Sequence, residues 1–552
     1  MSKLKKKPSL RGVNALKRHD IKTSTIVFLI YCFVCSGAFG IEEMIPSGPG
    51  ITITLLIVFP IIWAWPLSNI MAEAGSLMPA EGGIYVWVKE AFGEFWGFQA
   101  GWWNTASTYI TNGVYAALVV DYVSQYIQMS ETMAFTVKVF MILLFTVINL
   151  IGLKQVGSVS TALSIMILIG FSAVSVVGLL NWQFSPVEPY LAEDVGILEG
   201  VGGTAAICAW MYCGYESMSI VAGEVKKPQL IPKALMICMP LVMLSYVLPT
   251  AAGLVSVGEY ESWSTFSGEG TVGYADVLIQ NMGEVWGYGF LFIAIISQCA
   301  IFNAYLASGS RGFFVLADDN LCPKFLTRVS KKQGVPYVGV LSLTVVTILL
   351  AQYGFKTLVK AEVIFIMAMY VIMPPTIWKL RNKYPIEKRH GLFFISGGAA
   401  GLCVNTVIPM IMAVAVFFTN GTDNVLIGMF AAAAGPILYI LMKRVYGGCS
   451  KNNAAKYPLN RKTGLGQGDL FRIAVYSITA GAASLLGRVF LVWFESGWGQ
   501  AYYEEGEGVL SFGYQQMLDA LNYIGVAFMI AAVFLFLAGR LLEKSPRINS
   551  RH

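Results

Sequence analysis

Two apolar stretches of the chain are interrupted by glycine followed by acid. In the first, Gly37 and Gly40 precede Glu42 and Glu43, and in the second the run 214–216 reads Gly-Tyr-Glu. A carboxylate at membrane depth costs about 3 kcal/mol, so such groups normally face a cavity and carry function. The chemistry that these positions offer is therefore the binding of a cation or the carriage of a proton.

The two interruptions also have a backbone consequence. An unwound helix exposes N–H and C=O groups, which a membrane tolerates only where those groups line a cavity. Corresponding interruptions in two halves of a chain are the best sequence pointer to a binding site between them. Polar residues in the middle of other apolar stretches extend this candidate site, namely Tyr109, Asn112 and Asn303.

The charge of the candidate site favours a cationic ligand. Free amides at the start of a half-helix attract a carboxylate, but Glu42 and Glu43 in the same turn repel one and attract an ammonium group. The alternative is that both acids lie near the outer surface and only solvate a helix end, because Pro46 closes the segment. A buried carboxylate could itself carry a coupling proton, for which the candidates are Glu216, Glu43 and Glu42. Further proton candidates, for which an ion pair at a helix end is an equally good interpretation, are Glu73, Glu224 and Glu362.

The elements that would position these residues are membrane helices. Of the 552 residues, 56% are hydrophobic and 13% are charged, whereas soluble proteins carry roughly 25% charged residues. A spanning helix needs about 20 apolar residues, so the sequence predicts an all-α integral membrane protein with about 14 transmembrane helices. The expected spans are 23–45, 51–75, 95–124, 134–152, 158–181, 200–224, 233–256, 285–317, 337–353, 359–379, 391–418, 423–442, 468–494 and 516–542.

Charge placement predicts the orientation. The first 22 residues are rich in Lys and Arg, as are every second loop and its helix edges, which favours cytoplasmic placement of both termini. Lys138, Lys356, Lys360 and Arg488 depart from this pattern. The opposite loops carry acids without bases. We therefore expect a multi-pass protein of the inner or plasma membrane, and the net charge of +6 indicates topology rather than a nucleic-acid partner.

Several chemistries are excluded or disfavoured. No Gly-Lys dipeptide occurs, so no phosphate-binding loop is present, and ATP is not expected to drive this chain. The three histidines lie outside the long apolar runs, and the nine cysteines fall in apolar runs or basic loops. We expect no metal site, no cofactor and no disulfide scaffold. Partners are then the bilayer, a small-molecule substrate and a coupling proton or counter-substrate.

At the interruptions, the chain resembles the amino acid, polyamine and organocation (APC) superfamily. Residues 35–39, Cys-Ser-Gly-Ala-Phe, are similar to the family's glycine-rich break in helix 1. The most specific match is to the family's helix 6 signature, in 214–217, 222–225 and 231–234. The wording of 40–43 and 222–225 is similar to the polyamine-uptake and L-type amino-acid branch.

This resemblance implies a five-plus-five inverted-repeat, leucine-transporter-like core with broken helices 1 and 6. It implies a ten-helix core at 23–385, preceded by a basic arm at 1–22. Four extra C-terminal helices follow: helices 11 and 12 at 386–445, a cytoplasmic loop at 446–467, and helices 13 and 14 with a cytoplasmic tail at 468–552. By family position, substrate contacts would come from Ser36, Gly37, Ala38, Phe39, Gly40, Ile41, Trp210, Tyr212, Cys213, Gly214, Tyr215 and Glu216.

The resulting hypothesis is a secondary active transporter, a symporter or exchanger without ATP, that moves an amino acid or small amine by alternating access. The polyamine-uptake pattern has acids where this chain has Leu67, Thr111 and Met373, which disfavours a highly charged polyamine. Polyamine uptake stays open as an alternative. A passive channel or an intramembrane enzyme are the rival classes, although neither a repeated filter segment nor a nucleophile and base set is visible.

Overall fold

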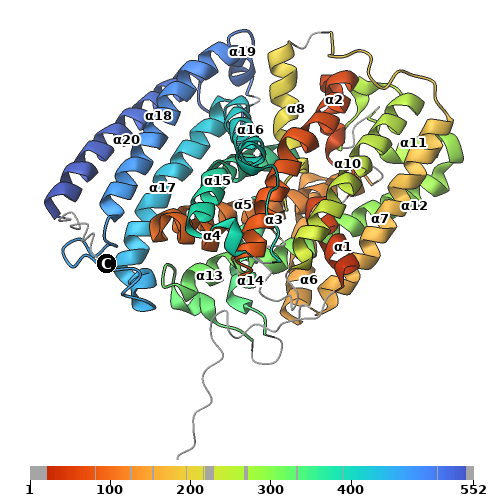
Figure 1. Ribbon diagram of the computed structural model, residues 1–552. Helices are drawn as coiled ribbons and strands as arrows, with labels where there is room; N and C mark the ends of the chain where they lie inside the picture. The colour runs from red at the N-terminus through yellow and green to blue at the C-terminus, as the bar shows by residue number, and fades with distance from the viewer. Residues whose placement is uncertain are drawn as a thin grey trace, which may run out of the picture.

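The protein folds as a bundle of long helices (Figure 1). The computed structural model describes residues 22–35, 37–80, 82–124, 127–151, 154–193, 196–215, 217, 229–265, 271–330, 334–389, 391–506 and 508–542, without the side chains of 154–161 and 203. Two candidate site residues, Ser36 and Glu216, therefore lie outside the described residues, as does most of 217–228.

A helix occupies each range in which the sequence predicts a span. In the first half these are α1 (Thr23–Val34), α2 (Pro49–Phe59) continuing through a π-helical turn into α3 (Trp65–Leu77), α5 (Glu94–Ser124), α6 (Glu131–Ile151) and α7 (Lys154–Leu180). In the second half they are α8 (Ile197–Met211), α10 (Leu230–Ser256), α12 (Glu284–Gly309) with α13 (Gly312–Asp318), α14 (Tyr337–Leu350) and α15 (Phe355–Lys383). The helices after the core are α16 (Gly398–Thr419), α17 (Thr422–Tyr446), α18 (Asp469–Phe494) and α20 (Tyr514–Leu542). Short helices between spans are α4 (Ile84–Phe92), α11 (Tyr274–Met282) and α19 (Gly499–Glu504).

Ten helices of the described residues are long and apolar enough to cross a membrane. The other expected spans correspond to the shorter apolar helices α1, α8 and α14 and to the long α5, which carries many buried polar residues. Of the shorter apolar helices, α1 and α8 end at the two interruptions, after Val34 and Met211. Fourteen crossings remain a prediction from the sequence.

The first interruption has a clear backbone cause. Helix α1 ends at Val34, and Gly37 and Gly40 then adopt φ angles of +104° and +92°, which only glycine reaches without strain. A Cβ on Gly37 would also lie 2.0 Å from the ring of Phe171. Two short 3₁₀ turns follow, at Ile41–Glu43 and Ile45–Ser47, before α2 begins.

The second interruption meets the first. Helix α8 ends at Met211, and Gly214 has a φ of +98°. A Cβ on Gly214 would lie 2.5 Å from the carbonyl oxygen of Phe33. The hydroxyl of Tyr246 on α10 lies 2.9 Å from both Val34 O and Met211 O, so one side chain ties together the ends of α1 and α8.

The last two long helices form a pair at one side of the bundle. In Figure 1, α18 and α20 lie side by side next to α17, at the opposite side from α7, α11 and α12. Helix α17 is joined to the core by a buried ion pair between Lys443 and Glu94, the first residue of α5. Helices α18 and α20 therefore extend the bundle at its side, away from the region between α1 and α8.

Candidate functional site

A closed pocket lies between the ends of α1 and α8. Its accessible space is ≈ 20 Å³, which is room for roughly one water molecule. A substrate can therefore enter only after side chains or helices move. The pocket is lined by Phe33, Val34, Gly37, Phe39, Ser107, Thr108, Thr111, Tyr115, Leu118, Trp210, Met211, Cys213, Gly214, Tyr246, Gln298, Tyr305, Glu362 and Ile366.

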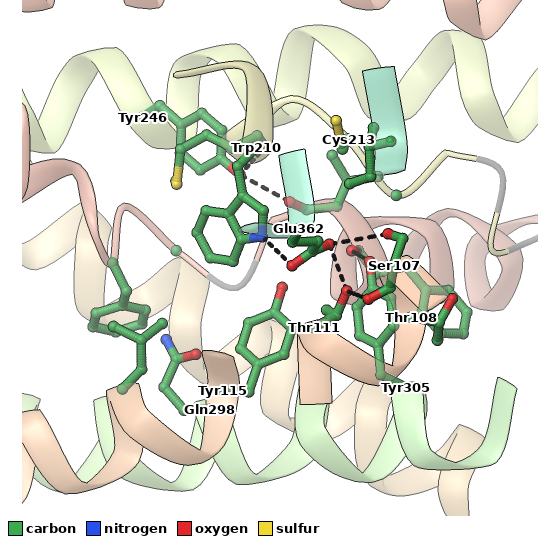
Figure 2. Close-up of a pocket in the computed structure, with 18 residues that line it drawn as sticks. Ser107, Thr108, Thr111, Tyr115, Trp210, Cys213, Tyr246, Gln298, Tyr305 and Glu362 are labelled. Carbon is green, nitrogen blue, oxygen red and sulfur yellow. Dashed lines mark hydrogen bonds between the residues drawn. The ribbon is translucent and has the colours of Figure 1, made fainter. Parts of the chain in front are cut away.

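Glu362 of α15 is the acid of this pocket, and its side chain is almost fully buried, at 2% exposure. Its Oε1 accepts hydrogen bonds from Thr111 Oγ1 at 2.5 Å and Ser107 Oγ at 3.4 Å, both on α5. Its Oε2 accepts one from Trp210 Nε1 at 3.1 Å, at the end of α8. Figure 2 shows these donors converging on the carboxylate, with the hydroxyl of Tyr115 directed towards it. Three donors orient the carboxylate at the junction of three helices.

Tyrosine hydroxyls donate hydrogen bonds to the backbone carbonyl oxygens that lose their helical partners at the interruptions. Tyr305 of α12 donates to Phe33 O at 2.7 Å, and Tyr246 donates to the last carbonyls of α1 and α8. These carbonyls would otherwise be buried without a partner, at a cost of about 1–3 kcal/mol each. In this closed state the side-chain acid, rather than the backbone, is the main negative group of the pocket.

Gln298 of α12 supplies an uncommitted amide. It is fully buried and lines the pocket, yet neither its Nε2 nor its Oε1 has a hydrogen-bond partner among the described residues. Figure 2 shows it beside Tyr115. A buried amide that can both donate and accept is costly unless something binds it, so Gln298 is a candidate for direct contact with a ligand.

A larger cavity, called the vestibule here, lies on the other side of two aromatic rings. It has ≈ 1280 Å³ of accessible space. Phe355 at the start of α15 lines the vestibule, and its ring packs edge-on against Trp210, with centroids 5.5 Å apart. Because Trp210 lines the pocket, these two packed rings lie between the two cavities. The other lining residues of the vestibule are Glu43, Val120, Asp121, Ser124, Gln128, Met129, Glu131, Thr132, Ala134, Phe135, Lys138, Ser264, Thr265, Ala351, Gln352, Gly354, Lys356 and Thr357.

Five of the residues expected to bind substrate line the pocket. They are Gly37, Phe39, Trp210, Cys213 and Gly214. Cys213, two residues after the end of α8, donates its thiol to Ala209 O in the last turn of that helix. Phe39 packs against Tyr122, Phe171 and Phe290. The neighbouring Ala38, Gly40 and Ile41 are buried but do not line the pocket.

The two acids of the first interruption lie in different places. Glu42 is buried and turns back on its own segment: Oε2 accepts from Gly40 N at 2.8 Å and Oε1 from Tyr122 Oη at 2.7 Å. Glu43 faces the vestibule, where Ser264 and Thr265 donate to it and Lys356 Nζ lies 3.0 Å away. Neither lines the pocket, so an ammonium in the pocket would meet Glu362 rather than Glu42 or Glu43.

The structure directs the mid-span candidates away from the pocket. Tyr109 bonds Ser342 on α14 at 2.9 Å, and Asn112 donates to Thr108 O of its own helix. Asn303 accepts a 2.6 Å hydrogen bond from Asn149 on α6. Tyr212 donates to Leu56 O, and the buried hydroxyl of Tyr215 has no partner among the described residues. None of these residues lines the pocket, and Tyr109, Asn303 and Tyr212 instead join helices.

The pocket residues that sequence reasoning did not name lie on α1, α5, α8, α10, α12 and α15, and Glu362 was named only as a proton candidate. Glu362 was visible as an acid in an apolar run, but nothing in the sequence distinguished a pocket acid from an ion pair at a helix end. Thr111, a polar mid-span residue that was a candidate together with Tyr109 and Asn112, does line the pocket. Thr108 and Tyr115 share with it the i, i+3, i+7 spacing of one helix face, which is a usable signal. Gln298 is a lone amide within an apolar run and could have been found by the same search as Asn303.

Residues 21–442 match the family model described as amino acid permease, which covers most of the chain. The chain belongs to this family. The family is part of the APC superfamily, so the resemblance seen in the sequence is confirmed, and the chain is a multi-pass membrane permease and not an enzyme.

Named relatives of the permease include plant and bacterial transporters. It is 30% identical over 444 residues to the polyamine transporter RMV1 of Arabidopsis thaliana, covering 79% of this chain and 87% of the relative. It is 30% identical over 423 residues to the polyamine transporter PUT1 of Oryza sativa subsp. japonica, covering 75% of this chain and 76% of the relative. Identity to the branched-chain amino acid permease BcaP of Bacillus subtilis is 23% over 369 residues, 62% of this chain and 76% of the relative.

A solved structure shows the fold. The crystal structure of MhsT in complex with L-phenylalanine superposes with a TM-score of 0.54 at 13% identity, covering 73% of this permease and 99% of MhsT. MhsT has the leucine-transporter fold, so the permease shares that fold. At this identity the likeness says nothing about the ligand.

Proposed function

We propose that this permease is a secondary active transporter that binds its substrate through an ammonium group at Glu362, either a small amine or an amino acid. Movement is by alternating access, as proton-coupled symport or as exchange. The single observation that carries the proposal is the buried carboxylate of Glu362 inside a closed pocket, oriented by Trp210 and Thr111. A buried carboxylate in an aromatic lining attracts a cation and rejects an anion.

The geometry supports alternating access in two ways. The pocket has room for roughly one water and no substrate, so this conformation is closed. The rings of Trp210, which lines the pocket, and Phe355, which lines a wide vestibule, also pack against each other between the two cavities. We infer that movement of these two side chains opens the pocket towards the vestibule.

The distribution of charge favours an amine, and one residue keeps the amino acid in consideration. Met373 stands where the polyamine-uptake pattern has an acid in helix 10, but Glu362 supplies an acid from another position of that same helix, α15. Gln298 has an amide that could donate to a substrate carboxylate or hydroxyl. An amine needs only Glu362, whereas a zwitterion needs both residues.

A thermal-shift screen of the detergent-purified protein tests the proposal, because a ligand that binds only the folded state raises its Tm. The probes are butylamine, diaminobutane and amino acids with their decarboxylated counterparts. We expect stabilisation by at least one ammonium compound in the wild type and none in Glu362→Gln. Glu284→Gln, an exposed acid at the start of α12, is the matched control and should behave as wild type.

The outcomes separate the substrate classes. If amino acids raise the Tm, their decarboxylated amines do not, and Gln298→Leu removes the effect of the amino acids, the site binds zwitterions. Stabilisation by amines that persists in Glu362→Gln would contradict the proposed site. Passive conductance of the reconstituted protein in planar bilayers would contradict the transporter mechanism in favour of a channel.

A further inference from the structure

The charged side chains that line the vestibule differ in how many hydrogen-bond and ion-pair partners they have. The acids among its described lining residues are Glu43, Asp121 and Glu131, and the bases are Lys138 and Lys356. Glu43 is satisfied by three donors and by Lys356, and Glu131 is exposed to solvent. Asp121 therefore differs from the other two acids.

Asp121 of α5 is 9% exposed and lines the vestibule. Its carboxylate takes part in no hydrogen bond or ion pair with any residue that the structure describes; Ser124 bonds only its backbone oxygen. A buried carboxylate normally has a partner, because desolvation of an ion costs several kcal/mol. A cation in the vestibule would provide one.

Two neighbouring charges act on Asp121 without contacting it. Lys138 attracts the carboxylate and Glu43 repels it. The ammonium of Lys138 is committed elsewhere, since it donates to Ala351 O at 3.1 Å and Tyr353 O at 3.4 Å. Lys138 thus offsets part of the charge but leaves the hydrogen-bonding capacity of Asp121 unused.

The position of Asp121 relative to the pocket follows from their shared helix. Thr111, which holds Glu362, lies ten residues before Asp121 on α5. At 1.5 Å per residue the two lie roughly 15 Å apart along the helix axis. An extended chain advances about 1.2 Å per bond, so a linear diamine needs about 12 or 13 bonds between its nitrogens to reach both acids.

We propose that Asp121 is a second cation-binding site, which takes the distal ammonium of a long linear amine whose leading ammonium is bound at Glu362. This inference rests on the proposed function of Glu362. A short amine occupies Glu362 alone, whereas a long amine occupies both carboxylates and passes between the rings of Trp210 and Phe355. The vestibule acid thereby gives the permease a preference based on the length of the amine.

Competition binding on the detergent-purified full chain tests this. The two probes are diaminobutane, with four methylenes, and diaminododecane, with twelve. We expect Asp121→Asn to weaken diaminododecane about tenfold and to leave diaminobutane unchanged, because a tenfold loss is typical of one charge-assisted contact. Glu131→Gln, which removes a vestibule charge of the same sign, is the matched control and should change neither affinity.

Unchanged diaminobutane affinity in Asp121→Asn also reports that the variant is folded. If that variant does not fold, Lys138→Gln tests the same site by removing the positive charge that attracts the Asp121 carboxylate. Diaminododecane should then bind more tightly. No change in diaminododecane affinity in either variant would overturn the inference, as would an equal loss for both diamines. The inference would also be overturned if replacing sodium with N-methylglucamine in the buffer weakened diaminododecane binding to the wild type as much as Asp121→Asn does. That result would assign the site to inorganic cations. Failure of the wild type to bind either diamine would instead contradict the proposed function.

Discussion

Trp210 and Glu362 are joined by a hydrogen bond of 3.1 Å that links the interrupted end of α8 to α15, two turns after the start of that helix. The same indole packs against Phe355, two turns earlier on α15, and so covers the pocket on the side of the vestibule. One side chain therefore orients the acid of the pocket and forms part of its cover. Movement of Trp210 would expose Glu362 and release one of its donors at the same time.

This dual position predicts how the pocket can be opened. Trp210→Ala should raise the rate at which a small thiol reagent modifies Cys213 by about tenfold, because Cys213 lines the pocket behind the indole and is buried in the wild type. Mass spectrometry of the labelled protein measures the rate. Cys213→Ser in the same background controls for the exposed Cys403. An unchanged rate would mean that Trp210 does not cover the pocket.

The hydroxyl of Tyr246 should stabilise the junction between α1 and α8. Tyr246→Phe leaves Val34 O and Met211 O without their donor, and a buried carbonyl without a partner costs about 1–3 kcal/mol. The free energy of unfolding in mixed detergent and SDS micelles should fall by that amount. Tyr523→Phe on the exposed face of α20 is the matched control and should have no effect.

The sequence located the ends of the pocket but not its walls. Hydropathy summed over about 20 residues is a strong signal, so each expected span contains a helix. Gly37 and Gly214 were found because they interrupt apolar runs, and their positive φ angles explain why glycine is needed there. In contrast, Tyr109 and Thr111 differ by about 200° around one helix, and hydropathy does not say which of them faces the pocket.

Glu362 illustrates the same limit for charge. An acid in an apolar run is compatible with an ion pair or with a binding site, and only the packing of α15 against α5 and α8 decides between them. Glu73 is the contrasting case: it is buried but held by Arg381 and Arg389, so its chemistry is structural. The two residues carry the same signal in the sequence and have different surroundings.

A cluster of charged residues around Glu90 on α4 should make the stability of the fold depend on pH. Burial alone would raise the pKa of Glu90 on α4, but hydrogen bonds from Lys383, Lys456 and Tyr384 outweigh it and lower the pKa to about 2. A lowered pKa means that the stabilisation is fully present above the unfolded value of about 4.5 and is lost as pH falls towards 2. The difference in Tm between wild type and Glu90→Gln should therefore be constant from neutral pH to about pH 5 and shrink below it. A difference that instead changed between pH 6 and 8 would show that another group titrates.

Replacing only one partner of the buried ion pair between Glu94 and Lys443 should lower the stability of the fold more than replacing both. Both side chains are almost fully buried, and Glu94 also accepts from Cys449 N at 3.0 Å. Lys443→Met leaves a buried carboxylate without its counter-ion, which costs about 3–5 kcal/mol, whereas adding Glu94→Gln removes the uncompensated charge. The double variant should then be more stable than Lys443→Met in the same SDS unfolding assay. Equal stability of the single and double variants would show that the two residues are not coupled, and that α17 is held to α5 by apolar packing alone.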